Sequence, residues 1–172
     1  VCSSDLGELP EGYDHKYIYS HIGYNLKATD MQAALGLSQL KKLDFFIKRR
    51  KENFDFLKRG LSEIEGIQLA KPTENSDPSW FGFPIVLDPN HPVDREELLR
   101  YLDSKKIGTR LMFAGNITRQ PAYKGVDFKI IGELNNSDVV MKRAFWIGVY
   151  PGLSEEMLSY VVESIREFMK RY

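Results

Sequence analysis

The second half of the chain alternates between apolar segments of strand length and amphipathic segments of helix length, and this order strongly constrains its fold. From residue 79 onwards the patterns predict a strand, a helix, a strand, a polar loop, a short helix, a strand and a last helix. The predicted strands span 79–87, 107–113 and 144–149, and residues 125–133 form a weak strand or an extended loop. This order predicts an α+β fold with a layer of helices on one face of the sheet.

Several residues set the expected boundaries of these elements. Asp94 and Ser154 are typical N-cap residues with acidic side chains in the turn that follows, so helices are expected at about 94–104 and after Ser154. Asn136 or Ser137 can cap the short helix, which is expected to end at residue 143. Pro84 has no N–H to offer a neighbouring strand, which favours an edge position or a bulge.

Two helical segments are expected before this region, at about 30–43 and 46–64. Thr29 and Gln32 have the spacing of a capping box at the start of the first segment. Asp44 can cap the second segment after a break. A polar connection with two prolines follows at 71–78, and we place a subdomain boundary near it.

The residues just before the capping box carry groups suited to binding an anion. His21, Tyr24, Asn25 and Lys27 lie within seven residues there. Asn25 can donate two hydrogen bonds, and Lys27 brings a point charge that suits phosphate. Because free N–H groups and the helix dipole favour an anion at a helix start, the stretch predicts a phosphate or anion site. An ordinary capped helix after a polar loop is the alternative interpretation.

A second group of recognition side chains lies in the polar loop at 114–123. Arg119 offers a planar fork of donors for phosphate or carboxylate, and Asn116 can both donate and accept. Arg110, just before the loop, is a weaker candidate because it can form a purely structural pair. The alternative is an ordinary surface loop.

The charge balance excludes several classes of partner. The 172 residues carry 24 Lys and Arg against 24 Asp and Glu, so no basic field exists to recruit nucleic acid or an acidic membrane. No apolar run approaches the roughly 20 residues of a membrane-spanning helix. Cys2 is the single cysteine, so we expect no internal disulfide and no cysteine metal cluster. These features are typical of a cytoplasmic enzyme.

The stretch G-Y-N-L-K-A-T-D-M-Q-A-A-L-G-L-S-Q-L resembles the G-x-N-x-R…Q-A-A-x-G-x-x-Q-L signature of the DegT/DnrJ/EryC1/StrS family of fold-type-I, PLP-dependent nucleotide-sugar enzymes. The resemblance runs from about Gly7 to the C-terminus and covers only the C-terminal part of such an enzyme. It implies an end of the large domain with an active-site loop at 7–28, bridging helices at 29–70 and a small C-terminal α+β domain at 71–172. Residues 1–6 do not resemble the family, and we expect a non-native tail there.

Three longer strings are similar to the CDP-4-keto-6-deoxyglucose 3-dehydrase branch, which serves deoxysugar synthesis for lipopolysaccharide O-antigen. They are L-P-E-G-Y-D-H-K-Y-I-Y-S-H-I-G-Y-N-L-K, F-A-G-N-I-T-R-Q-P-A-Y and F-W-I-G-V-Y-P-G-L-S-E-E-M. The resemblance implies removal of the hydroxyl at carbon 3 of a nucleotide-linked 4-keto-6-deoxy sugar, with pyridoxamine phosphate (PMP) or PLP as electron sink. A related sugar aminotransferase and a stand-alone α+β binding or dimerisation module are the alternatives.

The resemblance also suggests roles for particular residues. It implies that Asn25 reaches the cofactor phosphate of the neighbouring subunit of a homodimer, with His21, Tyr24 and Lys27 around it. Lys27 stands where many relatives carry Arg, so a bidentate phosphate contact is not expected there. We expect substrate contacts from Arg119, Asn116 and Arg110. No catalytic or metal-binding residue is expected in this chain, because the base, any 2Fe–2S cluster cysteines and most of the cofactor site would lie upstream. A reductase partner would accompany such a cluster.

Overall fold

The computed structural model describes residues 26–172, and the chain forms two compact units, Val1–Lys41 and Lys42–Tyr172. In the described part of the first unit, α1 (Asp30–Leu40) begins at the predicted capping box. The Thr29 N–H donates to Gln32 Oε1 over 2.9 Å, and the Gln32 N–H donates to Thr29 Oγ1 over 3.3 Å. No residue of α1 is buried. The helix ends three residues earlier than predicted.

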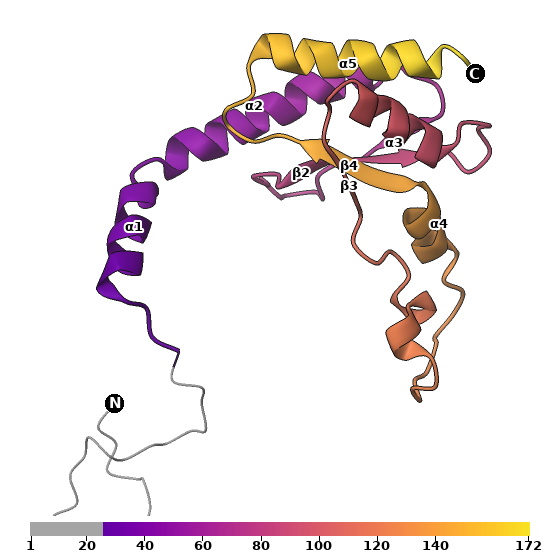
Figure 1. The fold of residues 1–172 in the computed structure, drawn as a ribbon, viewed down its shortest axis with the longest axis horizontal. Coiled ribbons are helices and arrows are strands. Elements are labelled where there is room, and N and C mark those ends of the chain that lie inside the picture. The colour runs from indigo at the N-terminus through magenta and orange to yellow at the C-terminus, as the bar shows by residue number, and fades with distance from the viewer. Residues whose placement is uncertain (1–25) are drawn as a thin grey trace, which may run out of the picture. The chain divides into compact units, whose positions relative to one another are not determined.

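The second unit begins with α2 (Leu43–Leu61), which starts before the predicted position. Asp44 does not cap it, because the N-cap position falls on Lys42 and no side chain bonds there. The helix packs along α5 (Glu155–Met169), and Figure 1 shows the two lying side by side. Ser154 caps α5 as predicted, by accepting a hydrogen bond from the Met157 N–H over 3.2 Å.

Four antiparallel strands form one sheet in the order β1-β2-β4-β3. Their bounds are β1 (Ile67–Leu69), β2 (Gly82–Leu87), β3 (Thr109–Leu111) and β4 (Ala144–Gly148). The sequence analysis missed β1, and the strand that it predicted at 144–149 is β4, an interior strand of the sheet. The expectation of an edge position for Pro84 holds only locally: β2 is an interior strand, but its pairing with β1 stops at Ile85. Among the described residues, Pro84 therefore has β4 as its only neighbouring strand, so no β1 residue is left without the N–H that Pro84 lacks.

One face of the sheet carries the core. Side chains alternate along a strand, and Phe83, Ile85 and Leu87 of β2 are fully buried. They join Phe145 and Ile147 of β4 in one cluster with α2, α5 and α3 (Arg95–Ser104). Asp94 caps α3 as predicted, by accepting from the Glu97 N–H over 2.9 Å. The predicted α+β fold is confirmed.

The remaining elements lie between β3 and β4. Two single-turn 3₁₀ helices, η2 (Ile117–Arg119) and η3 (Pro121–Tyr123), precede α4 (Asn135–Arg143). The prediction that Asn136 or Ser137 caps this helix is wrong, because it starts one residue after Leu134 without a side-chain cap. Residues 125–133 form an extended loop rather than a strand.

The division of the chain into an active-site loop, bridging helices and a small domain stays a prediction. In the structure α2 and β1 belong to the same compact unit as the sheet and α5. Over residues 26–172, no helix is both long and apolar enough to cross a membrane.

Candidate functional site

The polar loop after β3 is ordered around the side chain of Asn116. This side chain is 3% exposed, and its Oδ1 accepts from the Thr118 N–H over 3.1 Å and from Thr118 Oγ1 over 2.7 Å. These contacts cap η2, the turn that carries Arg119. Asn116 therefore shapes the loop from inside, whereas the sequence analysis expected it at the surface as a substrate contact. That contact stays a prediction.

Asp138 of α4 joins the two predicted recognition residues of this loop. Its Oδ1 accepts from Asn116 Nδ2 over 2.6 Å and from Arg119 Nε over 2.7 Å. Its Oδ2 accepts a further, very short bond from Arg119 Nη2. The hydrogen bonds from Arg119 and then from Asn116 lower the pKa of the Asp138 carboxyl to about 2. The structure thus brings Asn116 and Arg119 together through a carboxylate that sequence reasoning did not find.

The backbone of the loop lies directly against α4. Gly115 has a φ of +63°, and a Cβ at this position would collide with the backbone of Met141. Only glycine satisfies both conditions without displacing the loop. This close approach keeps Asn116 and Arg119 within reach of Asp138. Arg119 remains 57% exposed at its side chain, so part of its guanidinium faces solvent.

Arg110 lies outside this cluster, in the edge strand β3, directly opposite Trp146 of β4. It is exposed, and within residues 26–172 it makes no side-chain hydrogen bond or ion pair. The structural pair that we considered for Arg110 is therefore absent from this part of the chain. Within the described residues, all the donors of its guanidinium are therefore available to a ligand.

Of the four predicted cofactor-binding residues, His21, Tyr24 and Asn25 lie outside the described residues. Lys27 is described and exposed, two residues before the capped start of α1. Its position beside a helix N-terminus suits an anion, but the predicted site as a whole stays a prediction. The described residues contain no group of His, Cys, Asp and Glu that could hold a metal ion.

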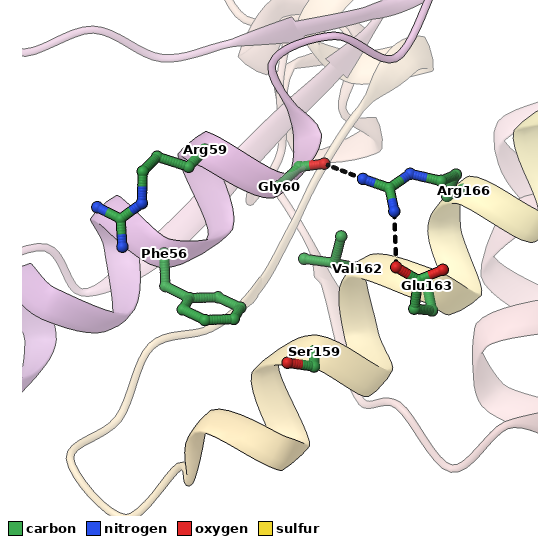
Figure 2. Close-up of a pocket in the computed structure, with 7 residues that line it drawn as sticks. All are labelled: Phe56, Arg59, Gly60, Ser159, Val162, Glu163 and Arg166. Carbon is green, nitrogen blue, oxygen red and sulfur yellow. Dashed lines mark hydrogen bonds and ion pairs between the residues drawn. The ribbon is translucent and has the colours of Figure 1, made fainter.

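Two cavities of the second unit are lined by residues other than the predicted site residues. Figure 2 shows a cleft of about 290 Å³ between α2 and α5, where Arg166 donates to the Gly60 carbonyl over 3.1 Å and to Glu163 over 2.6 Å. The bond to Gly60 ties α5 to α2, whereas the bond to Glu163 lies within α5 and orients the Arg166 side chain, so the cleft is a packing seam. A larger cavity of about 730 Å³ lies between the start of α5, the end of β4 and the residues just before β3, with Tyr150, Met157 and Tyr160 in its lining.

Comparison with known proteins agrees with the arrangement of the elements. The model of the DegT/DnrJ/EryC1/StrS aminotransferase family matches residues 6–166. The chain is 57% identical to the lipopolysaccharide biosynthesis protein RfbH of Salmonella typhimurium, over 95% of this chain and 38% of that protein. It is 53% identical to a dTDP-4-dehydro-2,6-dideoxy-D-glucose 3-dehydratase of Saccharopolyspora spinosa, over 96% of this chain and 36% of the relative. The chain thus spans well under half the length of both.

A solved structure shows the same fold. The Escherichia coli GDP-4-keto-6-deoxy-D-mannose-3-dehydratase with bound hydrated PLP superposes with a TM-score of 0.81. The match covers 96% of this chain and 41% of that structure, at 24% sequence identity. The sheet and the helices described above therefore correspond to one part of a larger enzyme.

Proposed function

This chain belongs to the DegT/DnrJ/EryC1/StrS aminotransferase family, and from that premise we propose that it is the C-terminal part of a nucleotide-sugar 3-dehydratase. The observation that carries the proposal is the identity of more than half the residues with a 3-dehydratase of a dTDP-linked keto sugar, along almost the whole chain. The enzyme would remove the hydroxyl at carbon 3 of a nucleotide-linked 4-keto-6-deoxy sugar in cytoplasmic deoxysugar synthesis.

The cofactor would be PLP or PMP, which supplies the electron sink when it is bound. Lys27 fits such a group, because an exposed ammonium beside the N-terminus of α1 suits a phosphate. Asn25, with His21 and Tyr24, would complete this contact across the interface of a homodimer. A 2Fe–2S cluster and a reductase partner belong to the same proposal and would involve residues outside this chain.

Arg119 and Arg110 are the groups we propose for the charged end of the substrate. Both are exposed, and each keeps guanidinium donors directed to solvent. Guanidinium groups bind phosphate oxygens in a planar, two-pronged geometry, which suits the diphosphate of a nucleotide-linked sugar. Asn116 contributes by shaping the turn that presents Arg119.

A sugar aminotransferase is the second candidate, because the family as a whole is described as an aminotransferase family. Product analysis of the full-length enzyme separates the two. We would load it with PMP and supply a CDP-linked 4-keto-6-deoxy sugar. A product that lacks the carbon-3 hydroxyl and carries no amino group supports the dehydratase, whereas an amino sugar formed with glutamate as donor establishes the aminotransferase.

A further inference from the structure

The sheet face opposite the core carries a row of side chains of which the proposed function uses only Arg110. Phe145 and Ile147 are buried on the core side, so Trp146 between them points to the other face. The strand register places Pro84 of β2 on one side of Trp146 and Arg110 of β3 on the other. Directly opposite residues of an antiparallel pair share a face, so these three side chains lie in one row.

Two phenylalanine rings lie against the indole of Trp146. The ring centroid of Phe81 is 5.2 Å from that of Trp146, and the centroid of Phe113 is 5.1 Å away. The planes are inclined by 53° and 74°, so both rings meet the indole at a steep angle. Phe81 is 75% exposed and Phe113 81% exposed, which leaves most of their surface open to a ligand. We call Phe81, Phe113 and Trp146 the aromatic platform.

The backbone holds the rings of the platform in place. A Cβ on Gly82 would lie 3.3 Å from Trp146 Cε3, so glycine leaves the indole room to lie close to β2. Arg50 donates to the carbonyl of Phe81 over 3.2 Å and fixes the bend before the strand. Phe113 has a φ of +49°, a conformation that is uncommon for a bulky side chain and is concentrated at functional sites.

The charge beside the platform selects among ligands. Arg110 is exposed and free of intramolecular side-chain bonds within the described residues, one strand away from the indole. An open aromatic surface next to an exposed guanidinium suits a ligand with a flat ring and a negative charge. Nucleotides combine both, since bases stack on aromatic side chains and their phosphates pair with arginine.

We propose that the aromatic platform and Arg110 bind the nucleoside diphosphate part of a nucleotide-linked sugar. The base lies against the platform, and a phosphate contacts Arg110. This inference rests on the proposed function for its ligand class and adds a binding surface to it. The charge complementarity between Arg110 and a phosphate favours a nucleotide over a second copy of the chain, whose matching face would bring two arginines together.

The test uses the ¹⁵N-labelled 172-residue chain and follows the two indole N–H signals by NMR during titration with CDP, GDP, dTDP or pyrophosphate. Trp80 is half-buried and stacks on Phe54 of the core at a ring-centroid distance of 4.2 Å, and it serves as an internal reference. We expect a saturable shift of the Trp146 signal with the nucleotides and a much weaker response to pyrophosphate.

Three variants and one control locate the binding surface. Phe81→Ala and Phe113→Asn, the latter chosen because asparagine tolerates a positive φ, are each expected to weaken nucleotide binding at least about fivefold. Arg110→Gln should weaken it similarly and remove the response to pyrophosphate. Phe45→Ala, which removes a 58% exposed ring from α2, should leave the affinity unchanged.

Three results would overturn the inference. One is a Trp146 signal that does not move at nucleotide concentrations of about 1 mM, the weak end of specific binding. Another is a response confined to the Asn116–Arg119 loop, which would leave the proposed function intact. The third is concentration-dependent association that Phe81→Ala abolishes, which would make the face an interface between copies. Product analysis of the full-length enzyme is independent of all three, so either proposal can fail alone.

Discussion

Arg119 and Asp138 form a two-pronged ion pair that links the loop after β3 to the first turn of α4, 19 residues later in the chain. The Asp138 carboxylate also accepts from the buried amide of Asn116. One carboxylate therefore fixes both the shape of the turn and the direction of its guanidinium. The Nε–H and one N–H of Nη2 are used by Asp138. The remaining N–H donors of Arg119 point away from Asp138.

The first prediction concerns Asp138 as a positioning residue in the proposed enzyme. In the full-length protein, Asp138→Asn should raise KM for the nucleotide sugar roughly tenfold, because the amide cannot orient Arg119 through two charged hydrogen bonds. The value of kcat should change much less. Steady-state kinetics of this variant and of Arg119→Lys provide the measurement.

A matched control for this prediction is Asp77→Asn, which removes another carboxylate paired with a basic side chain, Lys51, at an exposed site. It should leave KM unchanged. If Asp138→Asn and Asp77→Asn behave alike while Arg119→Lys loses affinity, Asp138 does not position Arg119.

The second prediction is a pH dependence of stability that originates at Asp138. Its pKa falls from an ordinary value of 3.8 to about 2 in the folded chain. A lowered folded pKa means that the unfolded state binds the proton more readily. The contribution of Asp138 is therefore complete above about pH 4, the unfolded pKa, and is lost as the pH falls through about 2. Urea unfolding of wild type and Asp138→Asn should give a difference that shrinks from pH 5 to pH 2. A constant difference over this range would contradict the assignment.

Local signals in the sequence predicted the parts of the fold that depend on neighbouring residues. Asp94, Ser154 and the Thr29–Gln32 pair act on N–H groups within three residues, so their spacing alone identifies them. The interior strand at Ala144–Gly148 was also predictable, because a continuous apolar and aromatic run is typical of a central strand.

Features that depend on distant residues were not predictable. β1 has only three residues, and its identity as a strand comes from pairing with β2 about 20 positions later. Nothing near Asp138 indicates that its partners lie in another loop. Phe81 is in phase with the buried Phe83, yet the bend before Gly82 turns its ring toward Trp146 on the other face. The alternation along the strand predicts on which face of the sheet a side chain lies. Only the tertiary structure shows that Phe81 departs from this alternation.

The third prediction concerns the seam between α2 and α5. A Cβ on Gly60 would lie 2.7 Å from Val162 Cγ2, and this branched side chain has little freedom to move aside. Gly60→Ala should therefore lower the free energy of unfolding by about 1–3 kcal/mol, despite the higher helix propensity of alanine. Urea unfolding at neutral pH measures the change.

Gly108→Ala is the control for the seam, because its added methyl group meets no atom within 4 Å and its backbone φ is not positive. It should leave the unfolding free energy within about 0.5 kcal/mol of wild type. Equal effects of the two substitutions would show that the helices adjust at Gly60 without cost.

The fourth prediction concerns the apolar surface of α1, where Leu35 is 63% exposed and Leu37 65% exposed. Exposed apolar patches of this kind bind hydrophobic dyes and promote association. We expect the isolated chain to bind such a dye, to associate as its concentration rises and to show no dehydration of a nucleotide sugar. Replacing Leu35 and Leu37 together by glutamine should reduce both dye binding and association, since burial of each leucine is worth about 1.5–3 kcal/mol. Gln39→Ala, which changes a polar residue of the same helix, should leave both unchanged. A monodisperse wild-type chain without dye binding would show that these leucines are covered in solution.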